Sequence, residues 1–169
     1  MHATLKFRKA PQADRGLRAE LRQTTPFASR EQEAYLALLR TADALQSRTE
    51  LTMKEFCLTG TQYNALRILR GAGPDGLPCS EIGERMITRD PDITRLLNRL
   101  EQRGLVERTR DRRDGRVVHG KISAAGQKLL REMQGPIEKE GREMLRHVSQ
   151  AELQKLIRLL ELVRSGSRM

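Results

Sequence analysis

The chain of 169 residues suits one domain of ordinary size, and its 32 basic against 22 acidic residues leave a net charge of +10. That excess favours an anionic partner, such as nucleic acid or a membrane surface. The sequence contains no apolar run typical of a membrane span or a secretory signal, too few cysteines for a disulfide scaffold or a Cys-based zinc finger, and few aromatic platforms for single-stranded nucleic acid. We therefore expect a soluble cytoplasmic protein with no membrane association.

The first 30 residues form the most basic segment of the chain. They hold seven basic and two acidic residues, a balance of +5, and show little apolar periodicity. This composition predicts a flexible N-terminal arm over residues 1–30 that follows DNA phosphates. A solvated tail without a partner is the alternative.

Helical periodicity follows directly. Apolar residues at helical spacing predict a long helix over residues 31–56 with one apolar stripe. Thr59 and Gln62 have the spacing of a capping box, which predicts the start of a second helix that ends near Gly71.

Two further helices are expected before residue 104. Ser80 is the predicted cap of a short helix over residues 81–86. Asp90 followed by Pro91 predicts the N-cap and first position of a fourth helix, which stops before Gly104 because glycine is favoured just beyond a helix end.

The rest of the chain predicts one hairpin and two more helices. Stretches 105–109 and 117–122 have strand character and flank a charged turn that contains Asp114-Gly115. Ser123 is the predicted cap of a fifth helix, bent or broken near Gly135-Pro136 and continuing to residue 147. Ser149 and Glu152 form another predicted capping box before an apolar-striped final helix. The expected fold is thus mainly α with one small β-hairpin.

The fourth predicted helix has two chemically different faces. At about 100° per residue, Ile93, Leu96, Leu97 and Leu100 share one face. The opposite face carries side chains able to bond base edges in a major groove, namely Arg95, Asn98, Arg99 and Gln102, with Thr94 at its edge. An ordinary amphipathic helix with a solvated polar face is the alternative.

The charged hairpin that follows strengthens the nucleic-acid interpretation. It carries five arginines, Arg108, Arg110, Arg112, Arg113 and Arg116. Such a wing can contact phosphates and place an arginine in a narrow minor groove. We expect Asp114 to orient neighbouring arginines through charge-assisted hydrogen bonds, while a solvated charged turn is the alternative.

Together these motifs resemble the MarR family, the multiple antibiotic resistance regulators. The resemblance runs through five stretches: Leu58–Tyr63, Ser80–Glu84, Thr94–Val106, Asp114–Arg116 and Ser123–Gly126. It implies a winged helix-turn-helix with long N- and C-terminal dimerisation helices, formed here by residues 31–57 and 123–169 around a DNA-binding lobe of residues 58–122. It also implies a homodimer that binds a pseudo-palindromic operator in double-stranded DNA, usually as a repressor.

On these grounds nine residues are expected to contact DNA: Ser80, Thr94, Arg95, Asn98, Arg99, Arg110, Arg112, Arg113 and Arg116. The resemblance further implies release by a small anionic or phenolic ligand, and it implies no cofactor. One departure is a pair of carboxylates at the start of the fourth helix. Capping accounts for Asp90, whereas Asp92 either accepts from cytosine N4 or turns aside.

The sequence leaves three other functions to be considered, and each has a distinct signature. An enzyme is not expected, because the sequence lacks a nucleophile elbow, a phosphate-binding glycine loop, an HExxH motif and paired cysteines. The basic arm and wing would also suit a sequence-indifferent architectural DNA-binding protein. A cysteine-based redox regulator is the third possibility, but Cys57 and Cys79 do not match the peroxide-sensing position near the start of the first long helix. The three histidines are scattered, and no metal site is expected.

Overall fold

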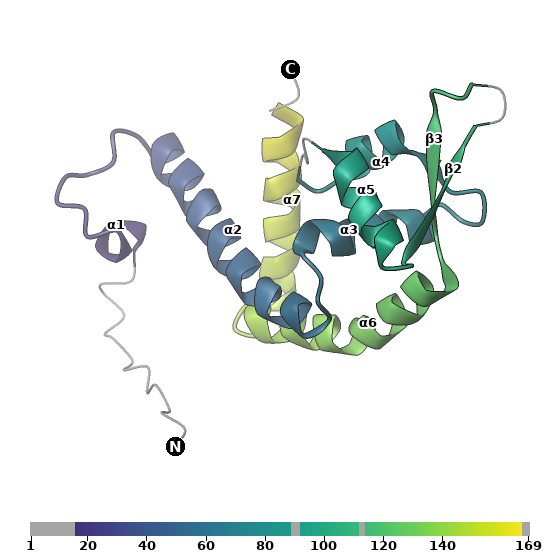
Figure 1. Ribbon diagram of the computed structural model, residues 1–169. Helices are drawn as coiled ribbons and strands as arrows, with labels where there is room; N and C mark the ends of the chain where they lie inside the picture. The colour runs from purple at the N-terminus through teal and green to yellow at the C-terminus, as the bar shows by residue number, and fades with distance from the viewer. Residues whose placement is uncertain (1–15, 89–91, 112–113, 167–169) are drawn as a thin grey trace. The chain divides into compact units, whose positions relative to one another are not determined.

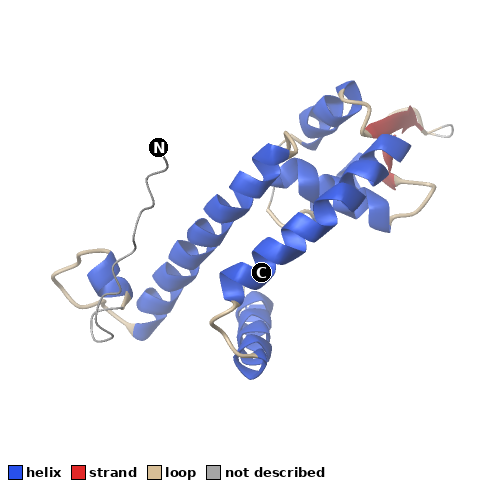
Figure 2. Ribbon diagram, turned by 90° about the horizontal axis from the view of Figure 1, so that it is seen from below, coloured by secondary structure: helices blue, strands red, loops and turns tan. Residues whose placement is uncertain are grey.

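The computed structural model describes residues 16–88, 92–111 and 114–166 (Figure 1). Helices dominate, and a small antiparallel sheet lies among them (Figure 2). In chain order the elements are α1 (Leu17–Glu20), α2 (Arg30–Glu55), α3 (Gly60–Gly71), β1 (Leu77–Pro78), α4 (Cys79–Arg85), α5 (Ile93–Gln102), β2 (Val106–Arg110), β3 (Val118–Ile122), α6 (Ala124–Leu145) and α7 (Gln150–Gly166). The mainly helical fold predicted from the sequence is confirmed.

The chain divides into two compact units, one reaching Gln46 and the other beginning at Ser47. In the first unit, part of the expected arm is ordered by local hydrogen bonds. The Arg18 guanidinium donates to the carbonyls of Gln23 and Thr24, and Glu20 pairs with Arg40 of α2 at 2.7 Å. Residues 1–15 of the predicted arm lie outside the described residues, and its flexibility and phosphate tracking stay predictions.

The second unit, which we call the winged-helix unit, is organised by helix caps that the sequence predicted. Thr59 and Gln62 make the reciprocal bonds of a capping box at the start of α3. Ser123 caps α6 by accepting from the Gly126 N–H at 3.0 Å. Ser149 and Glu152 likewise exchange hydrogen bonds before α7.

The expected hairpin is confirmed and is part of a larger sheet. Its strand order is β1-β3-β2, with both pairs antiparallel. Strand β1 was not predicted because a strand of two residues is too short to show an alternating pattern. It forms because Leu77 and Pro78 lie opposite Gly120 and His119 of β3. The sheet closes one side of the core.

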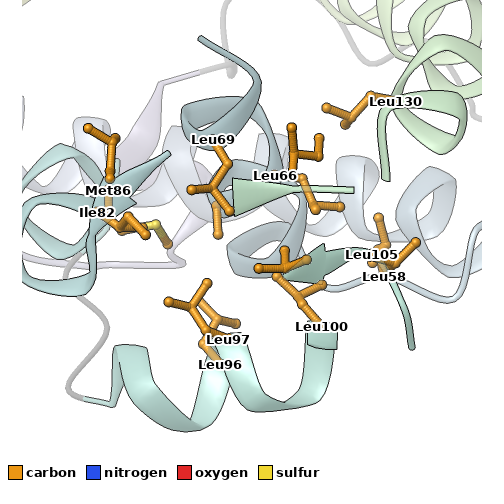
Figure 3. Close-up of a cluster of buried hydrophobic side chains, with 14 of the residues drawn as sticks. Leu58, Leu66, Leu69, Ile82, Met86, Leu96, Leu97, Leu100, Leu105 and Leu130 are labelled. Atoms are coloured by element: carbon orange, nitrogen blue, oxygen red, sulfur yellow. The ribbon is translucent and has the colours of Figure 1, made fainter. Parts of the chain in front are cut away.

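That core is built mainly from aliphatic side chains of the winged-helix unit (Figure 3). Leu66 and Leu69 of α3 and Ile82 of α4 are fully buried. Leu97 and Leu100 of α5 are fully buried as well, so the polar face of α5 is directed away from this core. Packing of the buried face therefore determines which side chains of α5 remain available to a partner.

Two predicted helix starts were wrong. Helix α4 begins at Cys79 after Pro78 and has no side-chain cap, so Ser80 lies in its first turn. Pairing of Pro78 with His119 ends β1 at Pro78, and α4 therefore begins two residues earlier than the Ser80 cap predicted. Helix α5 begins at Ile93 with Asp92 as N-cap, whereas Asp90 and Pro91 lie outside the described residues. Helix α6 continues through Pro136, which excludes the predicted break, whereas the predicted bend stays a prediction.

Candidate nucleic-acid interface

The exposed face of α5 is the centre of the candidate interface. Thr94, Arg95, Arg99 and Gln102 are exposed, and each lies between or beside the buried leucines of the same helix. The helix ends where the sequence predicted, because Gly104 has a φ of +68° and the Leu105 N–H bonds back to the Leu100 carbonyl. Its two faces are therefore held in a defined orientation relative to the core.

Asn98 differs from the other predicted base-contacting residues. It is only half-exposed, and its Oδ1 is buried without a hydrogen-bond partner among the described residues. A buried amide oxygen without a partner has a free-energy cost. Asn98 therefore lies at the boundary between the buried and exposed faces of α5.

Asp92 turns toward its own helix. Its Oδ1 accepts from the Arg95 N–H at 2.8 Å, and its Oδ2 lies 3.7 Å from the Arg95 Nε. Of the two alternatives that the sequence left open, the structure therefore favours a cap that turns aside. The Arg95 side chain is nevertheless 72% exposed, so this weak ion pair leaves its guanidinium accessible to solvent.

The wing lies beside α5, as the hairpin of β2 and β3 in Figure 1 shows. Arg108 of β2 pairs with Glu101 of α5 at 2.8 Å, and its side chain is only 22% exposed. This arginine thus joins the wing to α5. Arg110 and Arg116 are exposed, whereas Arg112 and Arg113 lie outside the described residues.

Asp114 organises the main chain of the wing turn. Its Oδ1 accepts from the Arg116 N–H at 3.0 Å, while its own N–H donates to Asp111 Oδ1 at 2.9 Å. Asp111 also lies 3.5 Å from His119 Nε2 across the hairpin. Among the described residues the Asp114 carboxylate accepts from the Arg116 main chain, and its expected bonds to neighbouring guanidinium groups stay a prediction.

Ser80 and two side chains that sequence analysis missed lie in or near the helix-turn-helix. Ser80 is exposed in the first turn of α4, which packs against α5. Asn64 of α3 accepts from the Ile87 N–H at 2.8 Å and so holds the turn after α4. Ile87 itself is 81% exposed. No sequence motif predicts this contact, because Asn64 and Ile87 are 23 residues apart and only the fold brings them together.

The cysteines have different environments. Cys57 is exposed, whereas Cys79 is half-buried and packs against the core. Burial raises the pKa of the Cys79 thiol, although nearby Arg108 acts in the opposite direction. A raised pKa reduces the reactive thiolate fraction, which does not favour redox sensing by Cys79.

Two other kinds of site can be assessed over the same part of the chain. Among the described residues, no cluster of three or more His, Cys, Asp or Glu side chains could hold a metal ion. No helix in the described ranges has both the length and the apolar character needed to cross a membrane.

Comparison with known proteins identifies the family of this arrangement. A family model described as MarR family matches residues 58–117, from the residue before the α3 cap into the wing. A MarR transcription factor of Planctomyces limnophilus is 43% identical, with 81% of this chain and 99% of that chain covered and a TM-score of 0.64. The chain belongs to the MarR family of transcriptional regulators. As a MarR-family regulator it is not an enzyme, which confirms the expectation from the sequence.

Other MarR-family relatives have names that describe their regulation. The homoprotocatechuate degradative operon repressor of Escherichia coli is 29% identical over 126 residues, covering 75% of this chain and 84% of the relative. The PcaV transcriptional regulator of Streptomyces coelicolor, solved in complex with its natural ligand, is 26% identical with a TM-score of 0.65. That comparison covers 75% of this chain and 91% of PcaV.

Proposed function

We propose that this MarR-family protein is a homodimeric repressor that reads a pseudo-palindromic operator in double-stranded DNA. The two-faced arrangement of α5 is the observation that carries this proposal. Leu97 and Leu100 fix the helix in the core, while Arg95 and Arg99 remain exposed on its other side. Arginine can bond guanine O6 and N7 together, so these side chains suit sequence recognition in a major groove.

The other predicted contacts have defined places in this proposal. Thr94 and Asn98 lie along α5 beside the arginines, and Asn98 needs a small rotation to present its shielded oxygen. Exposed Arg110 and Arg116 contact phosphates or an adjacent minor groove from the wing. Ser80 provides a hydroxyl for a phosphate at the start of α4. Arg112 and Arg113 continue the same basic wing, outside the described residues.

Apolar side chains on α2 and α7 support the homodimer. Tyr35 is 61% exposed on α2, and Ile157 and Val163 are 54% and 51% exposed on α7. No residue of α7 is buried within the described chain. A second copy would remove such surfaces from water, and a two-fold axis would present the same surfaces from both copies.

The names of two relatives support release by a small molecule. One is the repressor of a homoprotocatechuate degradative operon, and PcaV was solved with its natural ligand. The net charge of +10 further favours an acidic ligand over a basic one. We propose a small anionic or phenolic compound that binds the DNA-incompetent arrangement more tightly and so lowers operator occupancy. A panel of small phenolic acids, added to the preformed complex, tests this part directly.

Selection of bound duplexes at one moderate salt concentration tests operator recognition. We expect recovery of an inverted repeat with half-sites about 34–36 Å apart, one turn of DNA. Uniform retention without a motif would instead support a sequence-indifferent architectural protein. The same assay under reducing and oxidising conditions tests the cysteine-based alternative.

Single arginine substitutions separate base reading from phosphate contact. Arg95→Ala should weaken operator binding by about 1–3 kcal/mol and relax preference at one position of each half-site. Arg116→Ala should weaken binding to all sequences alike and reduce the dependence on salt. Arg70, which is exposed in the last turn of α3, provides a control substitution of the same charge. Equal losses for Arg95→Ala on operator and random DNA would contradict base reading by α5.

A further inference from the structure

The connection between α2 and α3 is a tight turn with an unusual backbone. Cys57 has a φ of +53°, in the left-handed region that favours glycine. The N–H groups of Cys57 and Leu58 bond back to the carbonyls of Lys54 and Met53. These bonds end α2, but they leave the Phe56 and Cys57 carbonyls available to another donor.

Arg103, the C-cap residue of α5, supplies that donor from a distant part of the sequence. Its Nη1 donates to the Cys57 carbonyl at 2.6 Å, and its Nη2 lies 3.4 Å from the Phe56 carbonyl oxygen. A guanidinium group presents several donors in a fixed plane and is attracted to the partial negative charge at a helix C-terminus. Arg103 therefore links the end of α5 directly to the end of α2.

Two further contacts hold this end of α2 to the winged-helix unit. Met53 is 2% exposed and belongs to the hydrophobic core. One turn or more earlier, Arg48 pairs with Glu140 of α6 at 2.9 Å. Met53 shares this core with Leu97 and Leu100 of α5, whereas the Arg48–Glu140 pair involves α2 and α6. The Arg103 side chain adds directional hydrogen bonds from α5 to the main chain at the α2 terminus.

We propose that Arg103 is a positioning residue that sets the angle between α5 and the C-terminal part of α2 within the winged-helix unit, and thereby the spacing between the two recognition helices of the dimer. This inference rests on the proposed function, in which α2 contributes to the dimer interface and α5 enters the major groove. A two-fold axis repeats any change of this angle in both copies. One base pair moves a half-site by about 3.4 Å along DNA and about 35° around it. A small rotation of α5 can therefore change which operator spacing fits both copies at once.

The test measures the affinity of the full-length protein for duplexes that carry its selected inverted repeat, with the central spacer unchanged or altered by one base pair. We expect the wild-type protein to prefer one spacer by about tenfold, since both half-sites must be engaged together. Arg103→Met removes both hydrogen bonds while keeping much of the side-chain length. For this variant we expect the preference to fall to about threefold or less, with unchanged base preference inside each half-site.

Controls separate positioning from charge and from stability. Arg70→Met removes an arginine charge from the exposed surface of α3, and Ile122→Val weakens the core at a residue of β3 that is 4% exposed. Both should retain the wild-type spacer preference. Arg103→Lys keeps the charge but not the planar fork, so its preference should lie between those of the wild type and Arg103→Met. If Arg103→Met does not fold, Arg103→Lys is the variant whose spacer preference tests the proposal.

The possible outcomes distinguish failure of the proposed dimeric function from failure of the proposed role of Arg103. If the wild-type affinity does not depend on the spacer, this result would contradict the proposed dimeric function and, with it, the proposed role of Arg103. A wild-type spacer preference that Arg103→Met and Arg103→Lys both retain in full would overturn the role of Arg103 alone. Loss of the preference in Arg70→Met or Ile122→Val to the same extent would also overturn it, because charge or stability would then suffice.

Discussion

Gly126 in the first turn of α6 gives a quantitative test of the packing beneath the wing. A Cβ at this position would lie 2.3 Å from the Leu105 carbonyl oxygen and 2.8 Å from Ile122 Cγ1. The Leu105 carbonyl accepts from the Ser123 N–H at 3.1 Å and comes directly before β2. Backbone would therefore have to move to accommodate Gly126→Ala, and that movement would disturb the entry to the wing.

The expected loss of stability in Gly126→Ala combines two destabilising contributions and one stabilising contribution. Overpacking a well-packed site costs about 1–3 kcal/mol, and we place this site at the upper end because the closest atom belongs to the backbone. Weakening the Ser123 hydrogen bond adds about 1 kcal/mol. Better helix propensity of alanine offsets about 1 kcal/mol of this cost. We expect Gly126→Ala to lower the free energy of unfolding by about 2–3 kcal/mol.

Gly141 in the same helix provides the matched control. A Cβ there would meet no atom within 4 Å, so Gly141→Ala should raise the free energy of unfolding by about 0.5–1 kcal/mol. Urea unfolding at one fixed protomer concentration measures both variants, because dimer stability depends on concentration. A Gly126→Ala variant as stable as wild type, or both variants shifting in the same direction, would refute the steric reasoning.

Three further predictions concern the turn after α2, the dimer and the thiols. Cys57→Gly should raise the free energy of unfolding by about 0.5–1 kcal/mol, because glycine adopts the positive φ without strain; urea unfolding measures the change, and a destabilised variant would contradict strain at this turn. Leu156→Asp places a charge in the exposed apolar stripe of α7 and should shift the protein toward monomers in analytical ultracentrifugation, whereas Gln154→Asp outside that stripe should not. At a pH below the raised pKa of Cys79, Cys57 should react faster than Cys79 with a thiol reagent, because Cys57 is exposed and the Cys79 thiol stays protonated. The difference between the two reaction rates should narrow as the pH rises and Cys79 ionises. Equal rates at neutral pH would contradict this prediction.

Sequence reasoning succeeded where structure depends on neighbouring residues. The Thr59 and Ser149 caps and the Gly104 terminus each use chemistry within a few residues, so their patterns are visible in the chain. The buried stripe of α5 was equally predictable, since Leu97 and Leu100 follow helical spacing.

The remaining features depend on contacts between distant residues. The sequence placed Arg108 in the charged hairpin without predicting its partner, and packing of β2 against α5 pairs it with Glu101. Arg103 bonds to the carbonyls of Cys57 and Phe56, which lie 46 and 47 residues away in the chain, and no local sequence pattern predicts such a contact. Asp90 and Asp92 flank Pro91 and both have capping chemistry, so composition alone could not choose between them.

The choice of Asp92 as the cap affects how the protein can hold DNA. A free helix N-terminus attracts phosphate through its exposed N–H groups and partial positive charge. In α5 the Asp92 carboxylate already occupies one of those N–H groups and brings a negative charge to the same end. Phosphate neutralisation must then come from lysine and arginine side chains elsewhere on the protein. Because phosphates are the same in every DNA sequence, we expect the Asp92 carboxylate to weaken sequence-independent binding at this end of α5.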